Sequence, residues 1–161
     1  MSDAASNYLE NKLLDHVLRY GSSYTQPGTV YCALFSGTAG STTTAGTVLY
    51  ALESGSSSTS GANNWGTYEI VGNAYARQPI TFGNAAAGGS ISNTGSAITF
   101  DPATGDYNNT ALSGSTVTCL AIMDALTGGN VLFFGSLTVS KQVSSGDQFT
   151  ISPGNLTVQL A

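Results

Sequence analysis

The chain has 161 residues, of which 8% are charged, while Gly, Ser and Thr together occupy 61 positions. Ordinary globular domains carry about a quarter charged residues, so most of this surface must consist of hydroxyl, amide and backbone groups. The length fits one domain with a real core, and an apolar content of 41% excludes a disordered chain. The formal net charge is −5, and the four basic residues lie singly along the chain. Composition therefore excludes nucleic acid and anionic membrane surfaces as partners, because both are bound through clustered positive charge.

The first predicted element is an amphipathic helix over residues 7–20, with Ser6 as its N-cap and Gly21 as its natural stop. Apolar residues recur there at three- and four-residue spacing and form one stripe: Leu9, Leu13, Leu14, Val17 and Leu18. Such a stripe needs cover, either from the helix's own domain or from a neighbouring subunit. We favour the neighbour, because the Gly-Ser-Ser link at 21–23 frees the helix and burying each side chain is worth about 1.5–3 kcal/mol. The stripe is therefore a candidate interface.

After the helix, the sequence pattern predicts only β-strands. Three apolar runs are the strongest, at 29–35, 117–123 and 131–139, and the loop 124–130 is typical of a hairpin between the last two. Shorter or weaker candidates complete the set, at 48–52, 67–71, 75–82, 97–100, 149–151 and 156–160 and around Ile91. Pro79 makes the run that contains it an edge strand or a bulge, because proline cannot donate to a sheet.

About eight short strands joined by Gly-rich turns predict a mainly β chain. We expect an antiparallel β-sandwich of jelly-roll type over residues 27–161, preceded by one short N-terminal α-helix and a linker in residues 1–26. A parallel α/β sheet is excluded, because no long helices lie between the strands. Residues 36–66 are nearly all Gly, Ser, Thr, Ala and Asn, which predicts a long loop that is either mobile or ordered by a neighbour.

Residues that carry chemistry are few. His16 is the only histidine, and its place on the polar side of the predicted helix indicates a solvated side chain. Cys32 and Cys119 lie in apolar runs and are interpreted as small buried hydrophobic residues, with a disulfide between them left open. The sequence contains no Cys/His cluster with zinc spacing, no Gly-rich phosphate loop and no recognisable acid–base pair of carboxylates. It therefore predicts neither an enzyme nor a metal or cofactor site.

Three aromatic residues stand in loop-like surroundings, namely Trp65, Tyr68 and Tyr107. We expect them to be exposed, because the phenylalanines fall within the strand runs and are more simply core. Exposed Trp and Tyr are the commonest anchors of protein interfaces, and they also stack on sugar rings. These three residues are therefore candidates for contact with a protein or a carbohydrate.

Several segments together resemble a known family. They are YLENKLLDHVL at 8–18, PGTVYCALF at 27–35, AYARQPITF at 74–82 and the region 122–147, which contains GGNVLFFGSL. They are similar to small virion proteins of tailed bacteriophages, often labelled tail-fibre proteins, some of which serve as capsid decoration (cement) proteins. The resemblance spans nearly the whole chain, with 36–66 as its least similar part.

The resemblance implies a non-enzymatic structural protein of the virion, assembled in the host cytoplasm. The leading hypothesis is a capsid decoration protein that contacts the major capsid protein, bridges capsomers and forms a closed homotrimer. One alternative is a tail or head–tail component. Another is a carbohydrate-binding module for host recognition that uses Trp65, Tyr68 and Tyr107.

Overall fold

The computed structural model describes residues 4–21, 23–53, 64–86, 88–109 and 116–159. Its elements follow one another as β1 (Ala4–Ala5), α1 (Asn7–Leu18), β2 (Val30–Ser36), α2 (Val48–Glu53), the 3₁₀ turn η1 (Trp65–Thr67), β3 (Gln78–Ile80), β4 (Ser90–Ser92), β5 (Ile98–Thr99), β6 (Thr116–Met123), β7 (Val131–Gln142), β8 (Thr150–Ile151) and β9 (Thr157–Gln159). The predicted class is confirmed, since the chain is mainly β, its strand pairs are antiparallel and one N-terminal helix precedes every strand except the two-residue β1.

The main sheet has five strands in the order β1-β7-β6-β2-β3, and β4-β9 and β5-β8 form two small sheets. Its central strands β2 and β6 are the apolar runs of the sequence, because a strand buried on both faces has no polar side to present. The predicted hairpin between β6 and β7 is confirmed. At its turn the Asp124 and Asn130 backbones are hydrogen-bonded, and the Asp124 carboxylate accepts from the Asn130 N–H at 2.6 Å.

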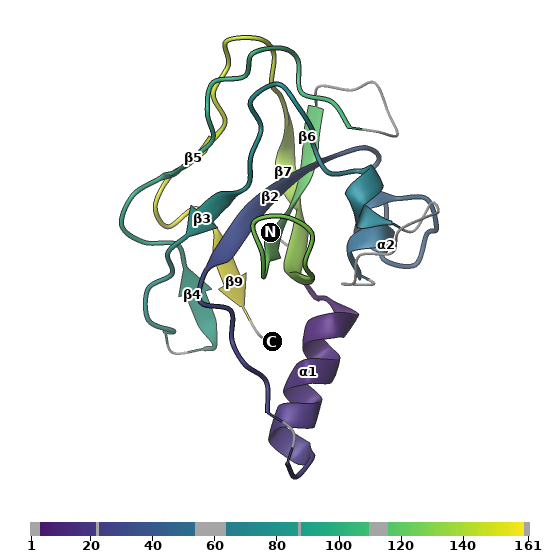
Figure 1. The fold of residues 1–161 in the computed structure, drawn as a ribbon, viewed down its shortest axis with the longest axis vertical. Helices are drawn as coiled ribbons and strands as arrows, with labels where there is room; N and C mark the ends of the chain where they lie inside the picture. Colours follow the sequence, from purple (N-terminus) through teal and green to yellow (C-terminus); the bar gives the residue numbers. More distant parts are fainter. Residues whose placement is uncertain (1–3, 22, 54–63, 87, 110–115, 160–161) are drawn as a thin grey trace.

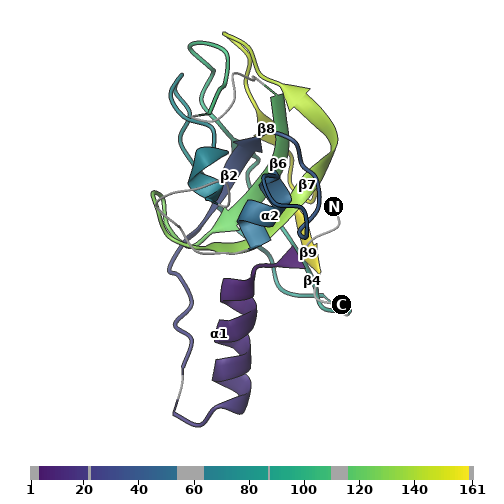
Figure 2. The same ribbon diagram turned by 90° about the vertical axis from the view of Figure 1, so that its right-hand side faces the viewer.

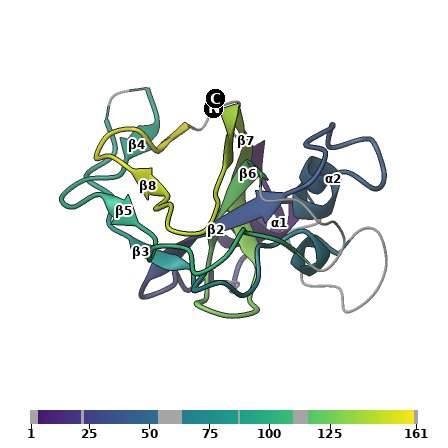
Figure 3. The same cartoon turned by 90° about the horizontal axis from the view of Figure 1, so that it is seen from above.

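Alternating side chains of the main sheet enter two separate apolar clusters. Cys32 and Leu34 of β2 face the small sheets, while Ala33 and Phe35 face α2 and η1. Figure 3 shows the main sheet between these two layers, with β4, β5 and β8 to one side and α2 to the other. A sandwich is thus formed on one face and a helical cover on the other, while the jelly-roll arrangement stays a prediction.

Residues 36–66 do not form a simple loop. The predicted strand at 48–52 is wrong, because Val48–Glu53 is the helix α2. Val48, Ala51 and Leu52 recur at helical spacing and are fully buried against the main sheet, so helical packing outweighs the β-branched and aromatic composition. The predicted strand at 67–71 is also replaced, by η1 and two isolated bridges. Residues 54–63 lie outside the described part of the chain.

The predicted N-terminal helix is confirmed and ends two residues earlier than expected. Ser6 caps it, since its hydroxyl accepts from the Leu9 N–H at 3.3 Å. Ser6 also fixes the helix to the main sheet, because its N–H donates to the Leu132 carbonyl at 2.9 Å and its hydroxyl donates to the Val131 carbonyl. From this attachment α1 projects away from the β-rich body (Figures 1 and 2).

Candidate functional site

The apolar stripe of α1 is divided between two environments. Leu9 is buried, and Leu13 packs against the apolar cluster that lies between the main sheet and the small sheets. The first turns of α1 therefore belong to the chain's own core. Leu14, Val17 and Leu18 are 57%, 73% and 77% exposed. The outer end of α1 (Leu14, Val17 and Leu18) is therefore an apolar surface that the described part of the chain leaves uncovered, on the element that projects furthest from the body (Figure 2).

The polar side of α1 is occupied by contacts within the chain. Arg19 lies 3.8 Å from Asp15, and the Lys12 ammonium lies 5.8 Å from the centre of the Tyr8 ring. The backbone N–H of Tyr24 donates to His16 Nδ1 at 3.1 Å, so the segment after the helix folds back along it. The interpretation of His16 as an exposed side chain is confirmed, and this side of α1 has its own partners.

The expectation that Trp65, Tyr68 and Tyr107 are exposed is wrong, because all three are buried. Trp65 packs edge-on against Phe35 at 6.4 Å between ring centres, within the cluster that α2 covers. Tyr107 packs edge-on against Tyr75 at 5.9 Å in the other cluster. Polar neighbours in sequence indicated loops, but these loops fold their aromatic rings into the core.

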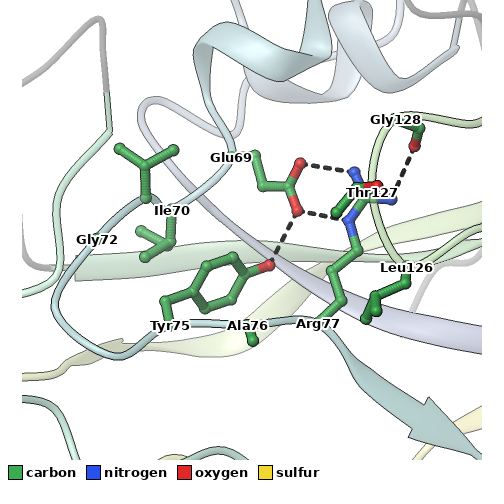
Figure 4. Close-up of a pocket in the computed structure, with 10 residues that line it drawn as sticks. Glu69, Ile70, Gly72, Tyr75, Ala76, Arg77, Leu126, Thr127 and Gly128 are labelled. Atoms are coloured by element: carbon green, nitrogen blue, oxygen red, sulfur yellow. Dashed lines mark hydrogen bonds and ion pairs between the residues drawn. The ribbon is translucent and has the colours of Figure 1, made fainter.

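A cleft of about 400 Å³ is lined by a largely buried ion pair (Figure 4). Arg77 donates from Nε to Glu69 Oε1 at 2.6 Å and from Nη2 to Glu69 Oε2 at 2.7 Å. Its Nη1 donates to the carbonyls of Ala125 and Gly128 in the β6–β7 turn, at 2.7 and 2.8 Å. The guanidinium carbon also lies 5.2 Å from the centre of the Trp65 ring. Arg77 thereby fastens the turn to the segment that follows η1.

Tyr75 completes this group and binds the backbone of β2 beyond the residues that pair with β3. Its hydroxyl donates to Glu69 Oε1 at 3.1 Å and accepts from the Leu34 N–H at 3.0 Å. Burial, and then the Glu69 carboxylate, hold the pKa of Tyr75 well above its ordinary 10, so the phenol keeps its proton. Four of the five N–H groups of Arg77 and the Tyr75 hydroxyl are engaged within the protein. This cleft therefore has the chemistry of a structural clamp.

Sequence reasoning missed the clamp, since Glu69 and Arg77 stand eight residues apart in an irregular segment. The available signal was weak: Arg77 is one of only four basic residues and lies within the predicted strand at 75–82. A basic residue in that setting needs a carboxylate partner if the strand is buried.

A second, apolar pocket of about 470 Å³ opens beside the attachment of α1. Its walls include Val30, Phe82, Ile91, Leu132 and Phe133, and none of the described residues that line it is charged. Leu132 and Phe133 belong to the part of β7 that binds β1 and Ser6. The pocket and the attachment of α1 thus share a wall.

Both cysteines are free thiols, which decides the question of a disulfide. Cys32 faces the small sheets and Cys119 faces α2, so the main sheet separates them. Burial raises the pKa of the Cys32 thiol to about 12 and that of Cys119 to about 11. Both act as small hydrophobic residues, as predicted.

Among the described residues, no group of three or more His, Cys, Asp and Glu side chains could hold a metal ion. Neither α1 nor α2 reaches the length and apolar character of a membrane crossing in the part of the chain that the structure describes.

Comparison with known proteins gives one family. The family model described as "Podophage GP4 fiber I protein gp80" matches residues 4–54 and 47–159. The two matches together include α1, both apolar clusters and the clamp. No curated protein matches the chain.

Proposed function

Because the chain belongs to the family described as Podophage GP4 fiber I protein gp80, we propose that it is a structural subunit of the tail-fibre apparatus of a tailed bacteriophage. The family description names a fibre protein, so it favours the tail-component alternative over capsid decoration. No observation on the described residues favours a role in the shell or a contact with the major capsid protein. A closed homo-oligomer, expected as a trimer, stays a prediction.

The carbohydrate-binding alternative loses its basis. It relied on Trp65, Tyr68 and Tyr107 as a stacking surface, and a buried ring cannot stack on a sugar. The clamp does not replace them, because the carboxylate of Glu69 and four N–H groups of Arg77 are engaged with one another and with the β6–β7 turn. The proposed role is therefore mechanical and non-enzymatic.

The outer end of α1 is the observation that supports assembly most directly. Leu14, Val17 and Leu18 are mostly exposed while the helix base is anchored, so the helix holds its apolar end at a fixed place. Full burial of such side chains is worth about 1.5–3 kcal/mol each, so covering what is now exposed would contribute roughly 3–6 kcal/mol. That amount supports a contact which many copies and further contacts reinforce.

Fractionation of virions tests the location. Purified particles are disrupted, tails and emptied shells are separated, and the chain is quantified by mass spectrometry against known tail and shell proteins. We expect the chain in the tail fraction, at a few to a few dozen copies per particle. Hundreds of copies in the shell fraction would instead establish capsid decoration and refute the proposal.

A triple substitution tests the assembly surface. Leu14→Gln, Val17→Gln and Leu18→Gln together keep good or tolerated helix residues but remove the apolar end of α1. We expect an unchanged melting temperature and at least tenfold lower incorporation into virions of a phage that lacks the gene. The matched control is Asn11→Gln with Asp15→Asn on the same helix, which should be incorporated normally. Normal incorporation of the triple variant would refute this role of α1.

A further inference from the structure

The N-terminal arm, defined as β1 and α1 (residues 4–18), is attached to the body mainly at one strand. Ala4 and Ala5 pair with Phe134 and Phe133 of β7, and Ser6 binds two carbonyls at the start of the same strand. The contacts of α1 with the strands of the body also centre on β7. The arm therefore binds at one place, the edge of β7 at residues 131–134, and we call this place the seat of the arm.

The connection from the arm to the body is long and exposed. Residues 19–29 lead from the end of α1 to β2 without regular structure in their described part, and most of them are exposed. Eleven residues reach about 36–40 Å when extended, whereas α1 is only about 18 Å long. Pro27 fixes its own φ angle and keeps Gln26 extended, so the end of the connection next to β2 is stiffened in an open form.

When the arm is bound to its own chain, the described residues leave two apolar surfaces uncovered, at the two ends of α1. One is the outer end of α1, and the other is the apolar pocket. Leu132 and Phe133 line that pocket and also belong to the seat of the arm. A second copy that approaches this edge would thus meet the attachment of the arm and the pocket together, while the outer end of α1 extends from them toward the neighbouring body.

We propose that the N-terminal arm is exchanged between copies, so that the arm of one chain occupies the β7 edge of its neighbour. The exchange forms again the same β1–β7 pairing, the same Ser6 hydrogen bonds and the same burial of Leu9, because the seat is identical. What changes is the path of residues 19–29, which are long enough for it but give up the Tyr24–His16 hydrogen bond and the present packing of Tyr24. What is gained is cover for Leu14, Val17 and Leu18 where the two bodies meet. This inference rests on the proposed function only in that a fibre subunit works as repeated copies.

An engineered disulfide across the seat tests the exchange. Ala5→Cys and Phe133→Cys together place two thiols on directly opposite residues of an antiparallel pair, whose Cα separation of about 4.5–5.5 Å suits a disulfide. The purified full chain is oxidised and run on a denaturing gel without reductant. We expect most of it in covalent species of two or more copies, while an internally bonded single chain would overturn the exchange.

Two controls distinguish specific exchange of arms from chance disulfide formation between chains. The unsubstituted chain, with Cys32 and Cys119 buried, and the single variant Ala5→Cys should both yield no more than traces of covalent dimer. A quarter or more of the Ala5→Cys chains in dimers would mean that arms meet by chance, and it would count against a specific exchange.

A second measurement needs no substitution, in case Phe133→Cys prevents folding. Isotope-labelled and unlabelled chains are unfolded, mixed and refolded, and NMR contacts between Ala5 and Phe133 are selected for those that join a labelled to an unlabelled chain. Their presence supports exchange. Their absence in a folded sample refutes it, yet leaves the tail location untouched, since that is measured independently in virion fractions.

Discussion

Leu9 and Leu18 both belong to the apolar residues of α1, yet Leu9 is 5% exposed and Leu18 is 77% exposed. The difference has two causes. At about 3.6 residues per turn the two side chains point to opposite sides of the helix, and Ser6 ties the first turn to β7 while the last turn extends beyond the body. From the sequence, either the helix's own domain or a neighbouring subunit could bury the apolar residues of α1. In the structure, Leu9 and Leu13 pack in the chain's own core. The outer end retains the features of a contact surface.

Replacement of Glu69 by Gln should destabilise the fold by about 3 kcal/mol. The substitution leaves the buried Arg77 without its counter-charge, and breaking one partner of a buried pair typically costs about 3–5 kcal/mol. Urea unfolding followed by the fluorescence of Trp65 measures the change. The matched control is Asp15→Asn, which breaks an exposed pair with Arg19 and should change stability by less than about 1 kcal/mol. Equal effects of the two variants would contradict a structural clamp.

Replacement of Ala74 by Gly should stabilise the fold by about 0.5–1 kcal/mol. Ala74 has φ +66° in the turn that the Tyr75 N–H closes on the Gly72 carbonyl, and left-handed backbone costs a side-chain-bearing residue about 1–2 kcal/mol. The greater freedom of glycine in the unfolded chain offsets part of that gain.

The reverse substitution in the same turn provides its control. Gly72 has φ +70° and open space around it, so Gly72→Ala should destabilise through backbone strain alone, by about 1 kcal/mol. Chemical denaturation of both variants checks the pair. A loss of stability in Ala74→Gly would show that this turn is not strained.

Stability should fall from about pH 9 upward. The thiols of Cys32 and Cys119 have raised pKa values of about 12 and 11 in the fold, against an ordinary 9.0, and the pKa of Tyr75 is raised above 10. Above pH 9 the unfolded chain has released protons that the folded chain still holds, so a rise in pH favours unfolding. Urea midpoints at pH 7.5, 9, 10 and 10.5 measure the slope.

The double variant Cys32→Ala, Cys119→Ala identifies the groups responsible. It should be less stable at neutral pH, because small cavities remain, but its decline should begin only near pH 10, where Tyr75 contributes. An unchanged onset near pH 9 would exclude the thiols as its cause.

Replacement of Tyr107 by Phe should leave the fold as stable as before or stabilise it by about 1 kcal/mol. The Tyr107 hydroxyl is buried and has no hydrogen-bond partner among the described residues, and an unsatisfied buried polar group costs about 1–3 kcal/mol. The ring contact with Tyr75 remains in the variant. Calorimetry of the two proteins compares their melting temperatures. A clearly lower melting temperature of Tyr107→Phe would show that the Tyr107 hydroxyl does form a stabilising hydrogen bond.

The parts of the fold that were predictable from sequence are those whose burial repeats along the chain. The apolar residues of α1 recur at helical spacing, and the apolar runs of β2, β6 and β7 are continuous and bounded by turn residues, so the existence and type of these elements follow from local pattern. The helix α2 was missed because six residues allow both a strand and a helix. The helical spacing of Val48, Ala51 and Leu52 could have distinguished them.

The misplacement of Trp65 has a different cause. Its burial depends on Phe35, α2 and Arg77, which come from three separate segments of the chain, and local composition contains nothing about them. The same holds for the clamp, whose acceptors in the β6–β7 turn lie 48 and 51 residues from Arg77. Long-range polar contacts leave no period in a sequence.

The seat of the arm has a consequence for synthesis on the ribosome. Ser6 and Val131 are separated by 125 residues, so at about 5–20 residues per second the arm emerges roughly 6–25 s before the strand that receives it. Helices form in about a microsecond or less, so α1 can form throughout this interval while β1 has no strand of its own chain to pair with. On a messenger read by several ribosomes, the first complete β7 that a nascent arm meets is therefore one that belongs to a finished neighbour.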